Sequence, residues 1–213
     1  MNRWTRYPLA ALCGLALLSA APAFADEPSA HAAATPEVAG IRGEIIANLK
    51  DASGKVIELA GAVPARKWGW RPAKGVRSVG EAYLHIAQAN YLLSSFLGAK
   101  PPLSEAVLSK LDTTPTTVER TLQLLKDSFA FAERTIADTP DSELAATASF
   151  FGQPMTKEAI MLAMATHTHE HLGQSIAYAR MNGVVPPWTA REQAAAAKRA
   201  AEKAKGSGAQ GGR

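Results

Sequence analysis

Hydrophobic residues recur at helical spacing through most of this 213-residue chain. The 3.6-residue period occupies four segments, which we predict as helices over residues 36–61, 78–97, 114–139 and 156–183. These segments do not alternate with strand patterns, and no glycine-rich phosphate loop appears. Four amphipathic helices have to bury their apolar faces against one another. The sequence therefore predicts an all-α fold, a four-helix bundle that forms one domain over residues 36–189.

The predicted helices begin and end at capping signals. Threonine or serine occupies each predicted start, and proline follows in two cases: Thr35-Pro36, Ser78, Thr114-Pro115 and Thr156. Glu81 follows Ser78 by three residues and completes a capping box. Gly183 is the expected left-handed stop of the last helix.

Three connections of mixed length join these helices. A long, turn-rich connector over residues 64–75 leads into the second helix, and a short amphipathic segment occupies residues 103–111. Residues 144–155 are predicted as a loop with a short extended piece around Phe150.

The first 25 residues have the pattern of a secretory signal peptide. Arg3 and Arg6 precede an apolar run over residues 9–18, and Ala-Phe-Ala at residues 23–25 fits the cleavage pattern of a signal peptidase. The run is shorter than the ~20 residues that a membrane span needs. We therefore expect a secreted, periplasmic protein with no membrane span after removal of residues 1–25.

Removal of the signal peptide would leave a chain without cysteine, because the single cysteine is Cys13. The mature protein would then have no thiol nucleophile and no disulfide. A metal ion would have to be bound through nitrogen and oxygen.

Charge is divided unevenly along the chain. Residues 26–189, which include a predicted linker at 26–35, carry 15 basic and 17 acidic side chains. This balance does not favour nucleic-acid binding. The Ala/Lys-rich tail at residues 190–213 is basic and prone to form helix, but it has no apolar stripe. We expect it to fray in solvent.

Histidines suggest a metal site. His167 and His171 are four residues apart, which places both imidazoles on one face of a helix. His85 lies among apolar residues of the second predicted helix. Three neutral imidazoles from two helices suit a divalent ion, Zn²⁺ or Ni²⁺, and leave positions open for water or substrate. His169 is rotated about 200° from His167 and should face away from the site.

Two further residues are candidates for a catalytic role. Gln174 shares the helix face of His167 and His171 and is expected to orient an imidazole or a bound water. Glu170 flanks that face and is a candidate proton shuttle, although an ordinary exposed glutamate also fits.

Three alternative interpretations fit parts of this pattern. The run from His167 to His171 matches the His-x-x-Glu-His pattern of inverted zinc peptidases, but only Glu192 and Glu202 follow it, both in the tail. A di-iron bundle needs two Glu-x-x-His segments, which are absent from the sequence. A helical interaction domain without a metal is a further alternative.

Two stretches of the chain resemble the DinB-like (DinB/YfiT) family of metal-binding four-helix proteins. Residues 68–81, Trp-Gly-Trp-Arg-Pro-Ala-Lys-Gly-Val-Arg-Ser-Val-Gly-Glu, lead to His85 as that family's connector leads to its first ligand. Residues 167–174, His-Thr-His-Glu-His-Leu-Gly-Gln, resemble its final helix, which carries the other two ligands. Leu172 departs from the arginine of many relatives, so a substrate contact by that arginine is not expected here.

The resemblance implies a divalent metal centre and, in some members of the wider family, transfer of a small thiol. We therefore expect either a metal-dependent hydrolase or thiol transferase with a small-molecule substrate, or a non-catalytic metal-binding or stress-related protein of the periplasm. Dimers are frequent among the proteins that this chain resembles, so the resemblance also implies a homodimer as one expected assembly. No cofactor besides the metal is expected.

Overall fold

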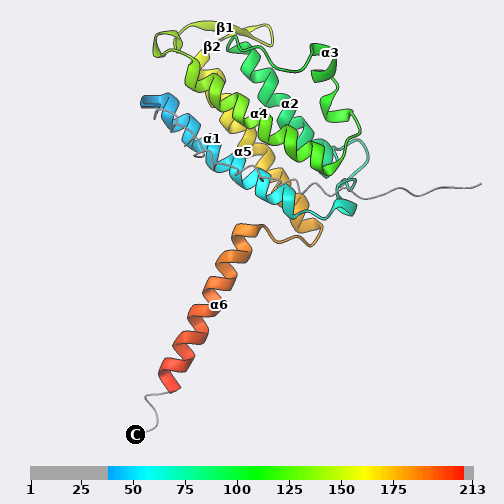
Figure 1. The fold of residues 1–213 in the computed structure, drawn as a ribbon, viewed down its shortest axis with the longest axis vertical. Helices are drawn as coiled ribbons and strands as arrows, with labels where there is room; N and C mark the ends of the chain where they lie inside the picture. The colour runs from blue at the N-terminus through cyan, green and yellow to red at the C-terminus, as the bar shows by residue number, and fades with distance from the viewer. Residues whose placement is uncertain (1–37, 209–213) are drawn as a thin grey trace, which may run out of the picture. The chain divides into compact units, whose positions relative to one another are not determined.

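Four long helices make up the main body of the protein (Figure 1). The structure is a computed structural model, and it describes residues 38–208. The long helices are α1 (Gly40–Ala62), α2 (Val79–Phe96), α4 (Val118–Asp138) and α5 (Lys157–Met181). The expected all-α bundle is confirmed.

Shorter elements fill the connections. They are three 3₁₀ turns, one short helix and one β-hairpin: η1 (Ala65–Lys67), α3 (Glu105–Leu108), η2 (Leu111–Thr113), η3 (Asp141–Glu143), β1 (Thr147–Phe150) and β2 (Gln153–Thr156). A further long helix, α6 (Pro187–Gly208), follows the bundle. Within residues 38–208, no helix combines the length and apolarity that crossing a bilayer would need.

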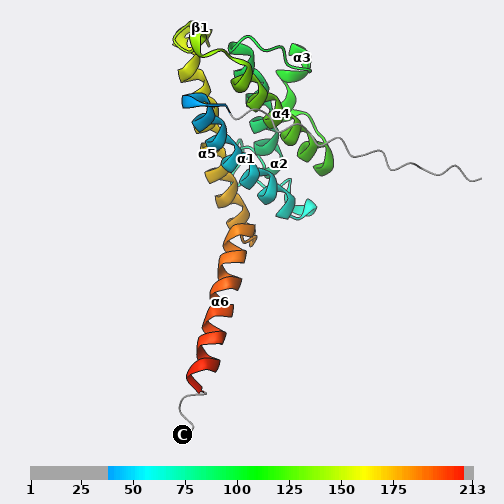
Figure 2. The ribbon, with the colours of Figure 1, turned by 60° about the vertical axis from the view of Figure 1, so that its left-hand side comes forward.

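The bundle has α1 and α2 at opposite corners. Helix α1 packs against α4 and α5, and α2 packs against the same two helices (Figures 1 and 2). The chain therefore crosses the end of the bundle between α1 and α2, and again between α4 and α5. Both crossings need long connections, which explains the connector that precedes α2.

One apolar core lies between the four helices. Its largest fully buried aliphatic and aromatic side chains are Leu49, Val56, Leu59, Tyr83, Ile86, Tyr91, Leu125, Ile136, Ile160, Met161 and Met164. Burying a side chain of this size contributes about 1.5–3 kcal/mol relative to its exposure. The core fixes how each helix is rotated, and this decides which histidines face one another.

Two of the four predicted helix starts are confirmed. Ser78 accepts a hydrogen bond from the Glu81 backbone, and the Glu81 carboxylate accepts one from the Ser78 backbone at 2.7 Å, as the capping box predicts. Thr156 caps α5. Helix α4 begins three residues later than expected, because Thr117 rather than Thr114 accepts the capping hydrogen bond.

The start predicted for the first helix is wrong. Thr35 and Pro36 lie outside the described residues, but residues 38 and 39 are not helical, and α1 begins at Gly40. Gly40 has a φ of 69°, a left-handed conformation that interrupts the helix and that glycine adopts without strain.

The loop predicted over residues 144–155 contains the β-hairpin. Strands β1 and β2 pair antiparallel, with Phe150 opposite Gln153. Phe151 and Gly152 form the two-residue turn, and both have positive φ angles, as the tightest hairpin turns require. The expected extended piece around Phe150 is therefore one strand of this hairpin. Figure 1 shows it above the end of the bundle where α5 begins.

Helix α6 begins at Pro187, three residues before the predicted tail, and continues to Gly208. Arg191 forms an ion pair with Glu58 of α1. Side chains from residue 190 to residue 204 are exposed. Fraying of this helix in solvent stays a prediction. The predicted signal peptide and linker lie outside the described residues.

Candidate metal centre

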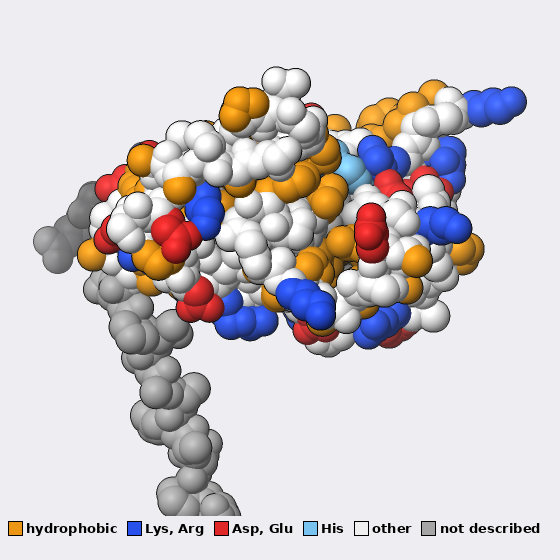
Figure 3. Space-filling model, turned by 90° about the horizontal axis from the view of Figure 1, so that it is seen from above, with side chains coloured by type: hydrophobic (Ala, Val, Ile, Leu, Met, Phe, Trp, Pro, Cys, Tyr) orange, Lys and Arg blue, Asp and Glu red, His pale blue; other side chains and the backbone are white. Residues whose placement is uncertain are grey.

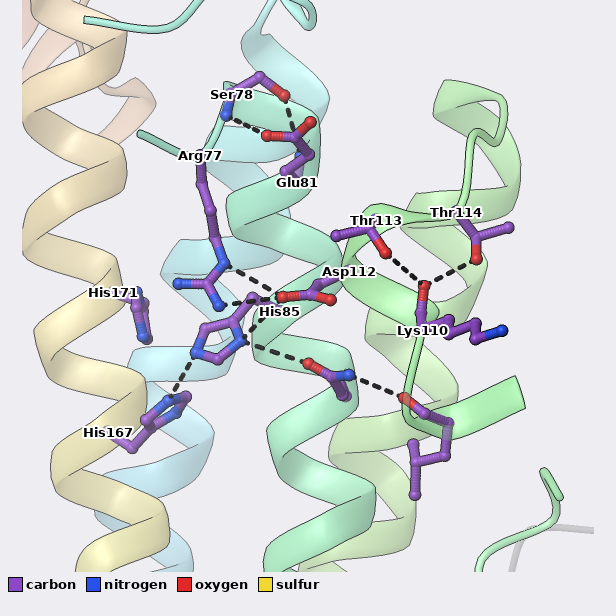
Figure 4. A network of polar contacts seen from close by, with 12 residues as sticks. Arg77, Ser78, Glu81, His85, Lys110, Asp112, Thr113, Thr114, His167 and His171 are labelled. Carbon is purple, nitrogen blue, oxygen red and sulfur yellow. Dashed lines mark hydrogen bonds and ion pairs between the residues drawn. The ribbon is translucent and has the colours of Figure 1, made fainter. Parts of the chain in front are cut away.

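Three histidines from two adjacent helices meet at one point. His85 comes from α2, and His167 and His171 come from successive turns of α5 (Figure 4). One nitrogen from each ring lies within 4.8 Å of the others, and the Nε2 atoms of His85 and His167 are 3.3 Å apart. We call these residues the three-histidine site. The juxtaposition predicted from the sequence is confirmed.

The geometry of the site fits a divalent ion. Two nitrogens bound tetrahedrally to zinc at ~2.0–2.1 Å are about 3.3–3.4 Å apart, close to the separation of His85 and His167. His167 Nδ1 is buried and has no hydrogen-bond partner among the described residues. Because His167 Nε2 is the atom that faces His85, Nδ1 is the outer nitrogen of the His167 ring.

A glutamine fixes the orientation of the His171 ring. Gln174 Nε2 donates to Tyr178 Oη at 3.0 Å, so Gln174 Oε1 is the atom turned toward His171. That oxygen lies 2.8 Å from His171 Nδ1 and can only accept, so Nδ1 carries the proton. His171 Nε2 is then left with its lone pair free. The expected orienting role of Gln174 is supported, while its catalytic role stays a prediction.

A second glutamine acts on His85 in the same way. Gln88 Nε2 donates to the Leu108 carbonyl at 2.7 Å, which turns Gln88 Oε1 toward His85 Nδ1 at 3.4 Å. Asp112 Oδ2 lies 3.7 Å from the same nitrogen. His85 Nε2 is therefore the atom that faces His167. Outer partners of this kind hold metal-binding imidazoles in position.

Sequence reasoning missed Gln88 and Asp112. The signal for Gln88 was present, because His-x-x-Gln occurs twice, at residues 85–88 and 171–174. Asp112 lies in the 3₁₀ turn after α3 and had no helical pattern to identify it.

The surroundings keep the imidazoles of His85 and His167 neutral. Burial, reinforced by the nearby His171, His85 and Arg77, lowers the pKa of His167 to about 3. Burial and the positive charge of Arg77 also lower the pKa of His85, although Gln88 and Asp112 act in the opposite direction. Only a neutral imidazole has a lone pair for a metal, so both rings are ready to bind one near neutral pH.

Other residues near the site take the following positions. His169 is exposed and its Nε2 lies 2.9 Å from Asn48 Oδ1, so it faces away from the site as predicted. Glu170 is exposed and has no hydrogen bond or ion pair within the described part of the chain, so its role as a proton shuttle stays a prediction. Leu172 is buried in the core.

The connector before α2 sets the position of His85. The backbone N–H groups of Val79 and Gly80 donate to the carbonyls of Trp70 and Trp68, at 3.0 and 2.9 Å. A Cβ on Gly80 would lie only 3.3 Å from the Trp68 ring, so glycine lets the tryptophan pack closely on the helix start. Trp68 is buried and its ring lies against Tyr83 of α2.

The surface around the bundle is mixed in character. Figure 3 shows histidine atoms at the surface between hydrophobic and charged side chains. The Glu81 carboxylate accepts from the Ser78 backbone and from Arg71, whose guanidinium lies 2.8 Å away, so it is not free to bind a metal. The third member of the histidine group is His85, not a downstream glutamate, which argues against the inverted zinc peptidase.

These observations define a helical-bundle protein with three histidines positioned to bind a metal. The sequence profile of the DinB superfamily matches residues 48–175, which span α1 to α5 and include all three histidines. The chain belongs to the DinB superfamily.

Solved structures agree with this assignment at the level of the fold. A DinB-like protein from Bacillus cereus superposes with a TM-score of 0.59 at 18% identity, covering 67% of this chain and 93% of that protein. A DinB-like protein from Bacillus subtilis gives a TM-score of 0.54 at 19% identity, with the same coverage. A conserved protein from Enterococcus faecalis gives 0.52 at 19%, covering 67% and 96%. No curated protein matches the chain in sequence.

Proposed function

We propose that the protein is a metal-dependent enzyme of the periplasm that acts on a small molecule, by hydrolysis or by transfer of a thiol. The observation that carries the proposal is the convergence of three imidazoles. Two of them, His85 and His171, have an ordered partner on the nitrogen that points away from the site. A divalent ion held there, Zn²⁺ or Ni²⁺, would lower the pKa of a bound water or thiol and supply a nucleophile near neutral pH.

The residues of the chain contribute binding and orientation. His85, His167 and His171 would hold the ion and leave at least one position for a ligand. Gln88 and Gln174 keep the imidazoles of His85 and His171 in the tautomer whose Nε2 faces the ion. Tyr178 orients Gln174 and packs edge-on against Trp70 of the connector.

The first experiment is metal analysis of protein purified from the periplasm. We expect close to one equivalent of zinc or nickel in the wild type and a loss of metal in His167→Ala. His169→Ala is the matched control, because His169 lies on the same helix but outside the site. A wild type without metal, or equal metal loss in both variants, would leave a helical interaction domain as the better interpretation.

The second experiment distinguishes an enzyme from a metal-storage or stress-related protein. Metal-loaded wild type and His167→Ala are screened for thiol transfer and for hydrolysis of esters and amides. Turnover that requires His167 supports the enzyme, and a protein that binds metal but turns over no substrate of these classes supports the non-catalytic alternative.

A further inference from the structure

An arginine lies beside the three-histidine site and is held there by a carboxylate. Arg77 Nε and Nη2 both donate to Asp112 Oδ2, at 3.2 and 2.9 Å. In Figure 4 the guanidinium lies next to His85, on the side of α2 that faces α5. Asp112 Oδ2, which accepts from Arg77, also lies 3.7 Å from His85 Nδ1, so the guanidinium lies close to the His85 ring.

Asp112 occupies only one edge of this guanidinium. Arginine has two edges with paired donors, one made by Nε and Nη2 and the other by Nη1 and Nη2. Asp112 takes the first, and Nη1 has no hydrogen bond to any residue that the structure describes. The second edge is therefore available, and the Arg77 side chain is 43% exposed, so a small molecule can reach it.

The charge balance of the site also favours an anion. Three neutral imidazoles bring no negative charge to a divalent ion, and Asp112 is already paired with Arg77. Glu81 is paired with Arg71 and the backbone of Ser78. A ligand that carries its own negative charge would compensate both the ion and the guanidinium.

We infer that Arg77 is a specificity-determining residue, which binds a carboxylate group of the small molecule that enters the three-histidine site. A carboxylate has two coplanar acceptor oxygens that match the paired donors of the free edge. Asp112 holds the guanidinium in place and also faces the outer nitrogen of His85. This inference rests on the proposed function, because it assumes a metal at the histidines and a ligand beside it.

The test compares two thiols that differ in one carboxylate. Cobalt-loaded protein is titrated with mercaptoacetate and with 2-mercaptoethanol, and binding is followed by the absorption band of the cobalt–thiolate bond. Mercaptoacetate should bind more tightly to the wild type, and Arg77→Gln should reduce its affinity about tenfold while that of 2-mercaptoethanol changes little. Each thiol is compared with itself in the wild type and the variant, so the different acidities of the two thiols do not affect the result.

Arg71→Gln is the matched control. Arg71 lies on the same connector, is 42% exposed and is also paired with a carboxylate, but it pairs with Glu81 away from the histidines. This variant should keep the wild-type preference for mercaptoacetate. Arg77→Lys keeps the charge without the paired donors, so its affinity for mercaptoacetate should fall less than that of Arg77→Gln.

The outcomes separate the inference from the proposed function. If the wild type binds cobalt but Arg77→Gln keeps the full preference for mercaptoacetate, Arg77 does not bind the carboxylate and the inference is wrong. If Arg71→Gln loses the preference equally, a general effect of positive charge explains the preference and the inference is wrong. If the wild type binds no cobalt, the proposed function itself fails. Circular dichroism of each variant shows whether the helices remain intact.

Discussion

Replacing Gln174 by leucine should weaken metal binding at the three-histidine site. The leucine keeps a similar volume but removes the oxygen that accepts from His171 Nδ1 at 2.8 Å. It also leaves Tyr178 without the donor that now reaches its hydroxyl at 3.0 Å. The His171 ring then loses its fixed tautomer, and a part of its population presents a protonated Nε2 to the site.

The magnitude follows from the geometry of this contact. Loss of an outer partner of a metal-bound histidine costs about 10–100-fold in affinity, equivalent to about 1.4–2.7 kcal/mol. The contact is short, and His171 has no second acceptor among residues 38–208, so we expect a value in the upper half of this range. Gln88→Leu should have a smaller effect, because its contact is 3.4 Å and Asp112 lies 3.7 Å from the same nitrogen.

The assay is a competition titration of zinc against a chromophoric chelator at constant pH. Gln174→Glu is the rescue variant, since its carboxylate still accepts from His171 and should retain most of the affinity. Gln123→Leu is the control, because that glutamine donates to Asp127 on α4, away from the histidines. Equal zinc affinity in the wild type and Gln174→Leu would refute the orienting role.

Two further predictions concern stability. Gly173 lies in the middle of α5, and nothing lies within 4 Å of a Cβ built on it. Gly173→Ala should therefore raise the free energy of unfolding, measured in urea, by about 0.5–1 kcal/mol. A loss of stability would show that the glycine has a packing role. The free energy of unfolding of the metal-free protein should fall by up to about 2 kcal/mol between about pH 7 and pH 5. The reason is that the pKa of His167 is about 3 in the folded state and near 6.5 in the unfolded chain, so the unfolded chain binds more protons as the pH falls. His167→Gln should show a weaker pH dependence, and parallel curves for the two proteins would contradict this explanation.

Local spacing was enough to predict most of the site. His167 and His171 face one direction because they are one helical turn apart, and the capping box at Ser78 fixed the start of the helix that carries His85. Their meeting in space was also predictable once both helices were expected to face one core.

Features that depend on the tertiary fold escaped sequence analysis. Asp112 and Arg77 meet across 35 positions of the chain and lie in irregular segments, so no periodic pattern pairs them. The hairpin turn has Phe151 at a φ of 50°, a position where asparagine or glycine would have been a recognisable signal. A glycine in the middle of a helix suggests close approach of another helix, but no atom lies within 4 Å of a Cβ built on Gly173, so its sequence position alone is misleading.

The arrangement of α2 and α5 has a mechanical consequence. His85 and His167 are 82 positions apart in sequence, and the chain between them forms all of α4 and the hairpin. An ion shared by these two residues would act as a cross-link that closes this long stretch into a loop, much as a disulfide does in a protein that has cysteines. Binding of the ion would then add to the resistance of the folded protein to proteases and heat.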